Sequence, residues 1–337
     1  MTALKIVITR SVVVALILAQ TSPASSASVP IAVTSGDAIK GTQSVVIGAF
    51  SVGFIFQAVD NEKQTGGMIG AFGGVTSAKT ELEGVTPQMM QTITDAAYAD
   101  FRAQIAANGM RVADSAPLFA STQFARAKPE VSPFETKVSL GKNSSGKVTF
   151  YKPSALPSLV MVPGDYTATV GFGGLGAMGN MMNDGQTQYA LAEYAKANGQ
   201  SVVDAVYLVD FANLKRGGGS VKVSSSLSVA GNYSRLTLIN PQGKVAHLTL
   251  KDSIPIDGDF AQMEDKTKGK NIQAGMNVLS GLASAASVFG GLGGGGMKFG
   301  KSRTYAFSVI PDAYVHGAGK ATAEANRRLI AELVTLK

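Results

Sequence analysis

Two kinds of hydrophobic pattern divide the chain into expected strands and expected helices. Residues 43–59 and 202–211 are nearly continuous apolar runs rich in β-branched and aromatic residues, which is typical of buried strands. Between and after them, alternation of polar and apolar residues predicts shorter strands, three of which would be antiparallel with a hairpin turn at 240–243. These shorter strands are expected at 110–113, 166–170, 221–230, 233–239, 244–250 and 303–310.

Apolar residues spaced three and four positions apart predict three helices. In the first, Thr86 supplies an N-cap oxygen, Pro87 suits the first helical position and Gly109 ends the helix. In the last, Glu324 and Arg328 are one turn apart and can form an ion pair. The three helices are expected at 87–108, 186–198 and 320–334, and the small-residue segment 271–289 is a further helix candidate.

The order of these elements predicts an α/β fold with an α+β tendency. Helices alternate with strands in the first half, and hairpin strands follow in the second half, so we expect a mixed sheet with packed helices and Gly-rich loops. Residues 28–337 would form a single domain. Within it, residues of about 115–165 read as an irregular insertion with a turn at 142–147, and about 272–300 as a Gly-rich segment.

The amino-terminal residues have the pattern of a bacterial export signal. Lys5 and Arg10 precede the short apolar run 11–19, and small residues at 25–27 offer a cleavage site. We therefore expect residues 1–27 to be a signal peptide. The alternative is a retained anchor helix, but the apolar run is well below the roughly 20 residues that a membrane span requires. The expected location is the periplasm or outer membrane of a Gram-negative bacterium.

The amino-acid composition excludes several kinds of site and partner. The absence of cysteine excludes disulfides, thiolate metal sites, a cysteine nucleophile and an acylated cysteine after the signal. The net charge is +7 and is spread along the chain without a basic tract, so we expect no nucleic-acid partner. The hydrophobic content of 45% permits a sizeable core at this length.

Two glycine motifs match nucleotide-binding patterns in sequence but not in expected context. Residues 295–302 fit the phosphate-loop pattern, yet they follow a Gly tract and enter an expected strand instead of a helix. Residues 171–176 fit the dinucleotide pattern, but the next helix is expected only at Gln186. We therefore expect no nucleotide and no cofactor.

Three Gly-rich segments share an apolar composition with few charges. The sequence Phe-Gly-Gly-Leu-Gly occurs twice, and a related segment precedes it. Mobile loops are one interpretation; the other is that these segments contact a membrane, a partner subunit or a polymer, because exposed apolar surface often marks an interface. The candidate interaction residues are Phe72, Gly73, Phe172, Gly173, Leu175, Phe289, Gly291 and Leu292.

No catalytic or metal-binding constellation can be assembled from the sequence. His247 and His316, both in expected strand contexts, have no ligand partner at helical or strand spacing. The acidic group at 252–265 lacks the register of a calcium loop and is expected to be a solvated turn. We expect no metal, no catalytic residues and, on balance, no enzyme.

The order of elements resembles a group of exported envelope proteins. Strand 45–56, helix 87–108, strand 109–112, a second helix, strand 202–210, antiparallel strands and a terminal helix together resemble the curli-secretion channel family and the related TolB amino-terminal domain. The resemblance implies an α/β periplasmic domain, oligomeric rings and, for the channels, membrane-entering hairpins. It carries over no functional residue, and the chain lacks the acylated cysteine that those channels use.

The function expected from the sequence is that of an exported, non-enzymatic cell-envelope protein. It would act through protein–protein or membrane contacts, as a secretion or assembly component for which a homo-oligomer is one fitting arrangement. The partners would be envelope proteins or the membrane surface. The alternative is an exported hydrolase or small-ligand-binding protein that uses Ser and Asp side chains in a cleft near residues 171–210.

Overall fold

The computed structural model describes residues 30–63, 75–141, 143–165, 175–217, 220–267 and 302–337. Most of these residues lie in helices and strands, and the elements are the following. The strands are β1 (Ile31–Thr34), β2 (Ser44–Lys63), β3 (Val75–Glu83), β4 (Arg111–Ala113), β5 (Phe134–Gly141), β6 (Ser144–Tyr151), β7 (Ser201–Gly217), β8 (Ser220–Val229), β9 (Arg235–Ile239), β10 (Val245–Leu250), β11 (Ile254–Ile256), β12 (Ala261–Asp265) and β13 (Ser302–Val309). The helices are α1 (Pro87–Ala107), α2 (Ala116–Phe119), α3 (Leu175–Asn198) and α5 (Pro311–Leu336), with short 3₁₀ turns η1 (Gly36–Ala38) and η2 (Phe124–Arg126).

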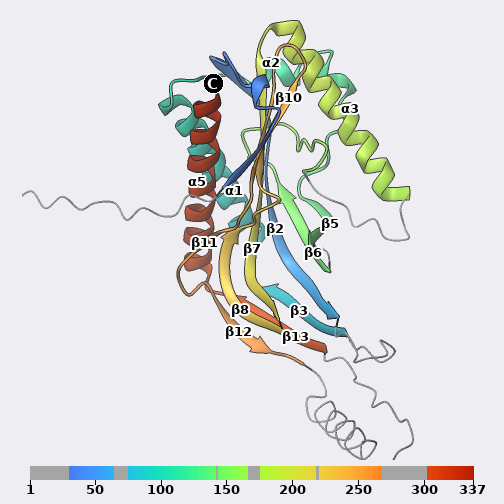
Figure 1. The fold of residues 1–337 in the computed structure, drawn as a ribbon, viewed down its shortest axis with the longest axis vertical. Helices are drawn as coiled ribbons and strands as arrows, with labels where there is room; N and C mark the ends of the chain where they lie inside the picture. The colour runs from blue at the N-terminus through green and yellow to red at the C-terminus, as the bar shows by residue number, and fades with distance from the viewer. Residues whose placement is uncertain (1–29, 64–74, 142, 166–174, 218–219, 268–301) are drawn as a thin grey trace, which may run out of the picture.

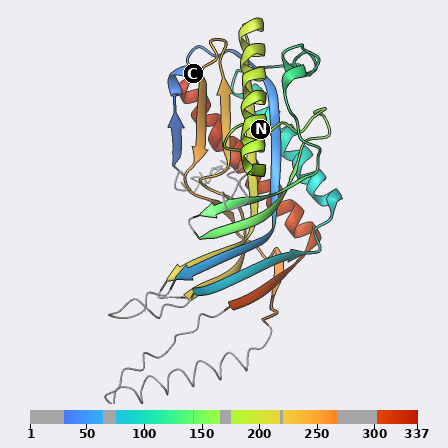
Figure 2. The ribbon, with the colours of Figure 1, turned by 90° about the vertical axis from the view of Figure 1, so that its right-hand side faces the viewer.

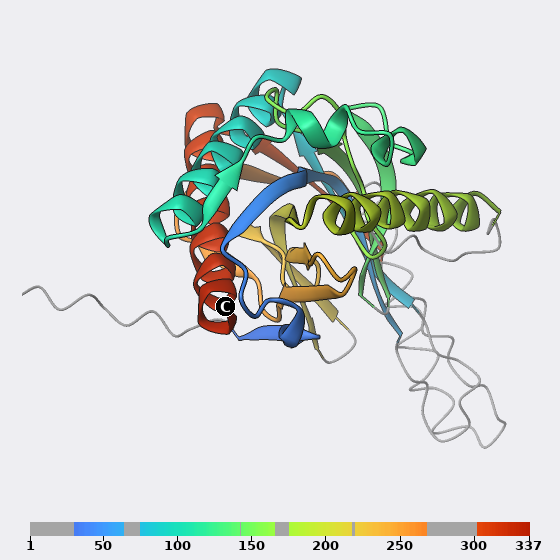
Figure 3. The same ribbon diagram turned by 90° about the horizontal axis from the view of Figure 1, so that it is seen from above.

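The strands of the described chain form one mixed sheet, which confirms the α/β fold class. Its main path runs β1-β10-β9-β7-β2-β3-β13-β12, and β4, β5, β6, β8 and β11 pair off this path. Helices α1 and α5 lie together on one side of the sheet and α3 lies on the other (Figures 1 and 3). The body of the protein therefore has three layers.

Two strands are much longer than the rest. Strand β2 has 20 residues and β7 has 17, whereas the mean strand in globular proteins is about 5–6 residues. They run parallel from Val45 to Phe54 of β2 and then diverge, because β2 continues against β3 and β6 while β7 continues against β8. The sheet thus extends well past the helices along the long axis of the molecule (Figure 1).

The core joins the sheet to the α1–α5 layer. The ring of Phe50 on β2 packs against Tyr98 and Phe101 of α1 and against Tyr207 of β7, with centroid separations of 5.3 to 5.6 Å. The helical spacing expected for α1 is confirmed by its buried face, which carries Met90, Ile93, Ala97, Phe101 and Ile105.

The predicted start of α1 is confirmed at the level of individual atoms. Thr86 has an extended backbone and its Oγ1 accepts a hydrogen bond from the Met89 N–H at 3.3 Å, while Pro87 opens the helix. Gly109, with a φ of 75°, ends it in the left-handed region that favours glycine. The Glu324–Arg328 pair on α5 is also confirmed, at 2.6 Å.

Two predicted helix starts are wrong. Helix α3 begins at Leu175, not Gln186, and α5 begins at Pro311, not Lys320. His316 accordingly lies on a helix, not in a strand context. In both cases glycines near the start lowered the helical signal, although tertiary packing can override so weak a propensity.

The segment 115–165, expected to be irregular, contributes regular structure. It contains α2, η2 and the β5–β6 hairpin, and β6 pairs with β2 over residues 52–60. The expected turn at 142–147 runs four residues too far, because residues 144–147 already belong to β6. The expected strand 166–170 and the helix candidate 271–289 lie outside the described residues.

Replacing either of two glycines of α5 with alanine should change the free energy of unfolding in opposite directions. A β-carbon at Gly317 would lie 2.4 Å from the Phe260 ring and 2.7 Å from Leu227, whereas one at Gly319 would have nothing within 4 Å. We expect Gly317→Ala to lower the free energy of unfolding by about 1–3 kcal/mol through overpacking. Gly319→Ala should raise it by about 0.5–1 kcal/mol through helix propensity. Urea unfolding of both variants checks this, and a loss in both would contradict it.

Candidate functional site

The strand ends that flank four connections lie at one end of the molecule, which we call the hairpin end. The connections join β2 to β3 (residues 64–74), β5 to β6 (142), β7 to β8 (218–219) and β12 to β13 (268–301). Strand directions require this arrangement, because β2 is parallel to β7 and antiparallel to β3 and β6, and β13 is parallel to β3 and antiparallel to β12. Figure 2 shows the strands leaving the body together.

The hairpins are joined to one another where they leave the body. The ring of Phe211 on β7 packs edge-on against Phe307 on β13 with centroids 5.3 Å apart, and Leu82 of β3 is buried nearby in the same core. Close to the turns, the Asn61 N–H of β2 donates to the Asn143 carbonyl of the β5–β6 turn at 3.0 Å. The hairpins therefore form one connected extension of the sheet.

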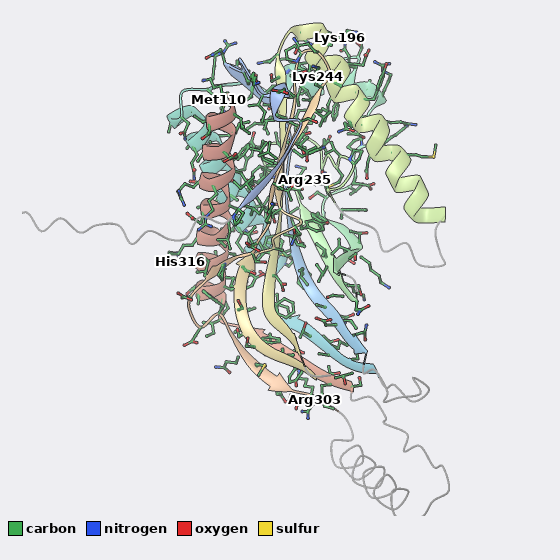
Figure 4. The ribbon with its side chains drawn as sticks, in the orientation of Figure 1. Met110, Lys196, Arg235, Lys244, Arg303 and His316 are labelled. Atoms are coloured by element: carbon green, nitrogen blue, oxygen red, sulfur yellow. The ribbon has the colours of Figure 1, made fainter. Side chains whose placement is uncertain are left out.

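The described hairpin surfaces are polar. Lys266 contacts Glu83 at 2.8 Å, and Arg303 contacts Asp265 at 3.4 Å. Figure 4 places Arg303 at this end of the molecule. The pKa of Glu81 is lowered, mainly because its carboxylate accepts a hydrogen bond from Lys79. These strands carry solvated charges, and Met263 of β12 is an exposed apolar side chain among them.

Two of the three predicted Gly-rich segments belong to the hairpin end. Phe72 and Gly73 fall in the β2–β3 connection, and Phe289, Gly291 and Leu292 fall in the β12–β13 connection; all lie outside the described residues. The third segment is separate, since it precedes α3: Phe172 and Gly173 lie outside the described residues, and Leu175 is the first residue of α3. Strand direction brings the first two together, which segment composition alone does not indicate.

A buried ion pair lies at the centre of the body, on the side of the sheet opposite α1 and α5. Arg235 of β9 donates to Asp165 at 2.7 Å and to the Pro163 carbonyl at 2.6 Å. The exposed fractions of the two side chains are 12% and 5%. Burial raises the pKa of Asp165, while Arg235 and the Val162 N–H act in the opposite direction. Figure 4 shows Arg235 in the middle of the sheet.

Asp204 of β7 is a second buried carboxyl beside this pair. Neither of its oxygens forms a hydrogen bond of standard geometry among the described residues, and the Ala49 N–H acts to lower its pKa. Burial raises its pKa well above the ordinary value, and Asp165 raises it further. The carboxyl lies over Gly48, at a bulge of β2, where a β-carbon would be 2.9 Å from Asp204 Oδ1. Asp204 therefore fills space that only glycine leaves open.

The hydroxyl beside these carboxyls is buried in the sheet, and the imidazole next to it is half-buried. Thr237 is opposite Asp204 in the sheet, and its Oγ1 is 3.0 Å from Nδ1 of His247. The threonine side chain is only 1% exposed, so a substrate cannot reach its hydroxyl. Burial also lowers the pKa of His247. In the described part of the chain, three cavities are lined by residues near the cleft of the alternative function: one of about 300 Å³ by Asp210, Tyr233 and Ser253, one of about 410 Å³ by Ser44 and Ser201, and one of about 710 Å³ by Gln186 and Tyr189 of α3. Burial raises the pKa of Asp210 to about 6.

The two glycine motifs differ in outcome. Ser302 at the end of the phosphate-loop match opens strand β13, so the expected strand context is confirmed. At 171–176, however, α3 begins directly at Leu175, so the expected gap before the helix is wrong and no longer argues against a dinucleotide fingerprint. Within the described residues, no three His, Cys, Asp or Glu side chains are grouped to hold a metal. None of the described helices is both long and apolar enough to span a bilayer.

No protein-family model, curated protein or solved structure matches this chain.

Proposed function

We propose that the protein is an exported, non-enzymatic cell-envelope component that acts through contacts made at its hairpin end. The observation that carries the proposal is the convergence of the strand ends that flank four connections on one end of an elongated molecule. A catalytic domain gathers reactive side chains in a cleft, whereas the described strands of this chain direct four connections to one end.

The sequences of the two long connections support contact with an apolar partner or a membrane surface. Residues 64–74 and 268–301 contain no acidic residue and are rich in glycine and apolar side chains. Lysines at 268, 270, 298 and 301 flank the apolar part of the second connection. Such a composition suits an interface with envelope proteins or with anionic lipid.

Open sheet edges support an oligomeric form. In the described part of the chain, β5 and β12 pair on one side only. The edge strand β12 is exposed at three successive residues, including Met263 with 47% exposure. Unpaired edges are templates for pairing with another chain. This feature agrees with a secretion or assembly component, as the resemblance to the curli-secretion channel family would imply.

The test is to make the apolar connection polar and measure assembly. We expect the wild-type protein to form an oligomer or a lipid-bound fraction in light scattering coupled to size exclusion, with and without liposomes. Replacing Met276, Leu279, Leu282 and Val288 together by serine should reduce that fraction at least about tenfold, since each large side chain contributes roughly 1.5–3 kcal/mol when buried.

The control replaces Ser280, Ser284, Ser287 and Ala286 by threonine, which keeps the length and charge of the connection. It should leave assembly within about twofold of wild type, because no large apolar side chain is lost. A compact monomer that does not bind liposomes would refute the proposal. If such a monomer also carried a small molecule in native mass spectrometry, the ligand-binding alternative beside Asp210 would be favoured.

A further inference from the structure

A groove of about 580 Å³ lies between the amino terminus of α1 and the β5–β6 hairpin. Its volume falls within the roughly 300–1,000 Å³ typical of small-molecule sites. The lining is mostly apolar and comes from segments far apart in sequence. The apolar residues are Phe56, Val85, Pro87, Met90, Pro133, Val148 and Tyr151.

Two lysines at the groove form no ion pair with a described residue. Lys137 of β5 and Lys147 of β6 are direct partners in the antiparallel register, so their β-carbons are about 4.5–5.5 Å apart. Both are exposed, both line the groove, and neither forms an ion pair with any described residue. Like charges directly opposite each other destabilise a sheet, and an anion held between them would remove that repulsion.

Other charges around the groove are few. Glu135 precedes Lys137 by two residues on the same face and opposes Thr149. Its charge contributes, after burial, to the raised pKa of Tyr151. Helix α1 presents its amino terminus to the groove and has no acidic residue in its first turn, so the positive end of its dipole is uncompensated there.

We propose that this groove binds a single-chain amphipathic anion, that is, an alkyl chain ending in a carboxylate or phosphate. The chain would lie on Phe56, Met90 and Tyr151, and the headgroup would lie between the two lysines. An uncharged apolar ligand would leave the lysine pair unused, and a cation would be repelled by it. The inference concerns the body of the protein and does not depend on the proposed role of the hairpin end.

Calorimetric titration with a carboxylate series tests the apolar part of the site. Octanoate, decanoate, dodecanoate and tetradecanoate, each below its micelle concentration, should bind with affinity rising about two- to fourfold per methylene until the groove is full. Dodecyl phosphate should bind at least as well as dodecanoate. Dodecanol and dodecyltrimethylammonium should bind about tenfold more weakly or not at all.

Charge variants test the polar part of the site. The double variant Lys137→Gln/Lys147→Gln should lower dodecanoate affinity about tenfold, and Glu135→Gln should raise it about two- to fivefold. The matched control Lys196→Gln/Lys244→Gln removes two exposed lysines at the opposite end of the molecule and should change nothing (Figure 4). All five replaced residues are exposed, and unchanged melting temperatures of the three variants would show that the fold is intact.

The opposite results are equally definite. Equal binding of dodecanoate and dodecyltrimethylammonium, or equal loss in the Lys196/Lys244 control, would overturn the proposal by showing adsorption without a site. A carboxylate affinity that does not change with alkyl chain length would overturn it by showing that the alkyl chain does not bind in the apolar groove.

Discussion

Replacing Arg235 with alanine is expected to lower the free energy of unfolding by about 3–5 kcal/mol, because it leaves the buried carboxylate of Asp165 without its counter-charge. The pair is short, at 2.7 Å, and both side chains are almost fully excluded from solvent. Arg235 also donates to the Pro163 carbonyl, which would lose that bond. Chemical denaturation monitored by circular dichroism measures the effect.

The loss should depend on pH with a defined sign. Burial raises the pKa of Asp165 and of Asp204, and Arg235 opposes the rise in both. A carboxyl whose pKa is higher in the folded than in the unfolded state contributes stability below its unfolded pKa, and this contribution is lost as pH rises through the folded pKa. Without Arg235, the folded-state pKa values of Asp165 and Asp204 both rise further. The difference between wild type and variant should therefore be smaller at about pH 5 than at about pH 8.

Two further variants make the result decisive. Arg303→Ala removes an exposed ion pair, with a 3.4 Å contact and 47% exposure of the arginine, and should cost under about 1 kcal/mol. Adding Asp165→Asn to Arg235→Ala should restore part of the stability, because the orphaned charge is removed. An Arg235→Ala loss no greater than that of Arg303→Ala would show that the pair is not desolvated in solution.

The elements that were predicted from the sequence are those whose buried positions carry large apolar side chains. Strands β2 and β7 are apolar runs, and α1 shows both a complete cap and a periodic buried face. Strand β3 was missed because most of its buried side chains are small or polar. They are Thr76, Ala78, Thr80 and Leu82. Small and polar side chains can pack inside a sheet when cross-strand neighbours cover them, and such burial leaves no hydrophobic alternation to detect.

The start of α5 was missed because a glycine near it serves packing instead of turning the chain. Gly317 lies inside α5 because Phe260 and Leu227 occupy the space of a side chain. A scan that treats glycine as a breaker places the start after it, at Lys320. Pro311 at the first helical position and Asp312 in the first turn were the available signals for the true start.

The candidate site was predicted in composition but not in arrangement. The sequence identifies the Gly-rich segments, and only the pairing of strands shows that 64–74 and 268–301 leave the body at the same end. The groove beside α1 depends on a register that sets Lys137 opposite Lys147. The register of a hairpin is fixed by its turn, and the expected turn at 142–147 is too long to give this pairing.

Replacing Asn326 with alanine is expected to cost about 3–5 kcal/mol, because one fully buried amide connects three elements. Its Oδ1 accepts from the Tyr207 hydroxyl of β7 at 2.6 Å, and its Nδ2 donates to the Ala97 carbonyl and the Asp100 carboxylate of α1. The loss would leave several buried polar groups unsatisfied, each costing about 1–3 kcal/mol before relaxation. Tyr207→Phe, which deletes only one of these bonds, should cost about 1–2 kcal/mol.

The matched control for this site is Gln104→Ala. Gln104 also bonds Asp100, at 2.7 Å, and the Ala323 carbonyl of α5, but it is half-buried, so water can replace both contacts. We expect a loss below about 1 kcal/mol. Equal losses for Asn326→Ala and Gln104→Ala would mean that water enters between α1 and α5. The predicted order, Asn326 above Tyr207 above Gln104, would instead show that a dry polar contact holds the helices on β7, one of the two strands that continue into the hairpin end.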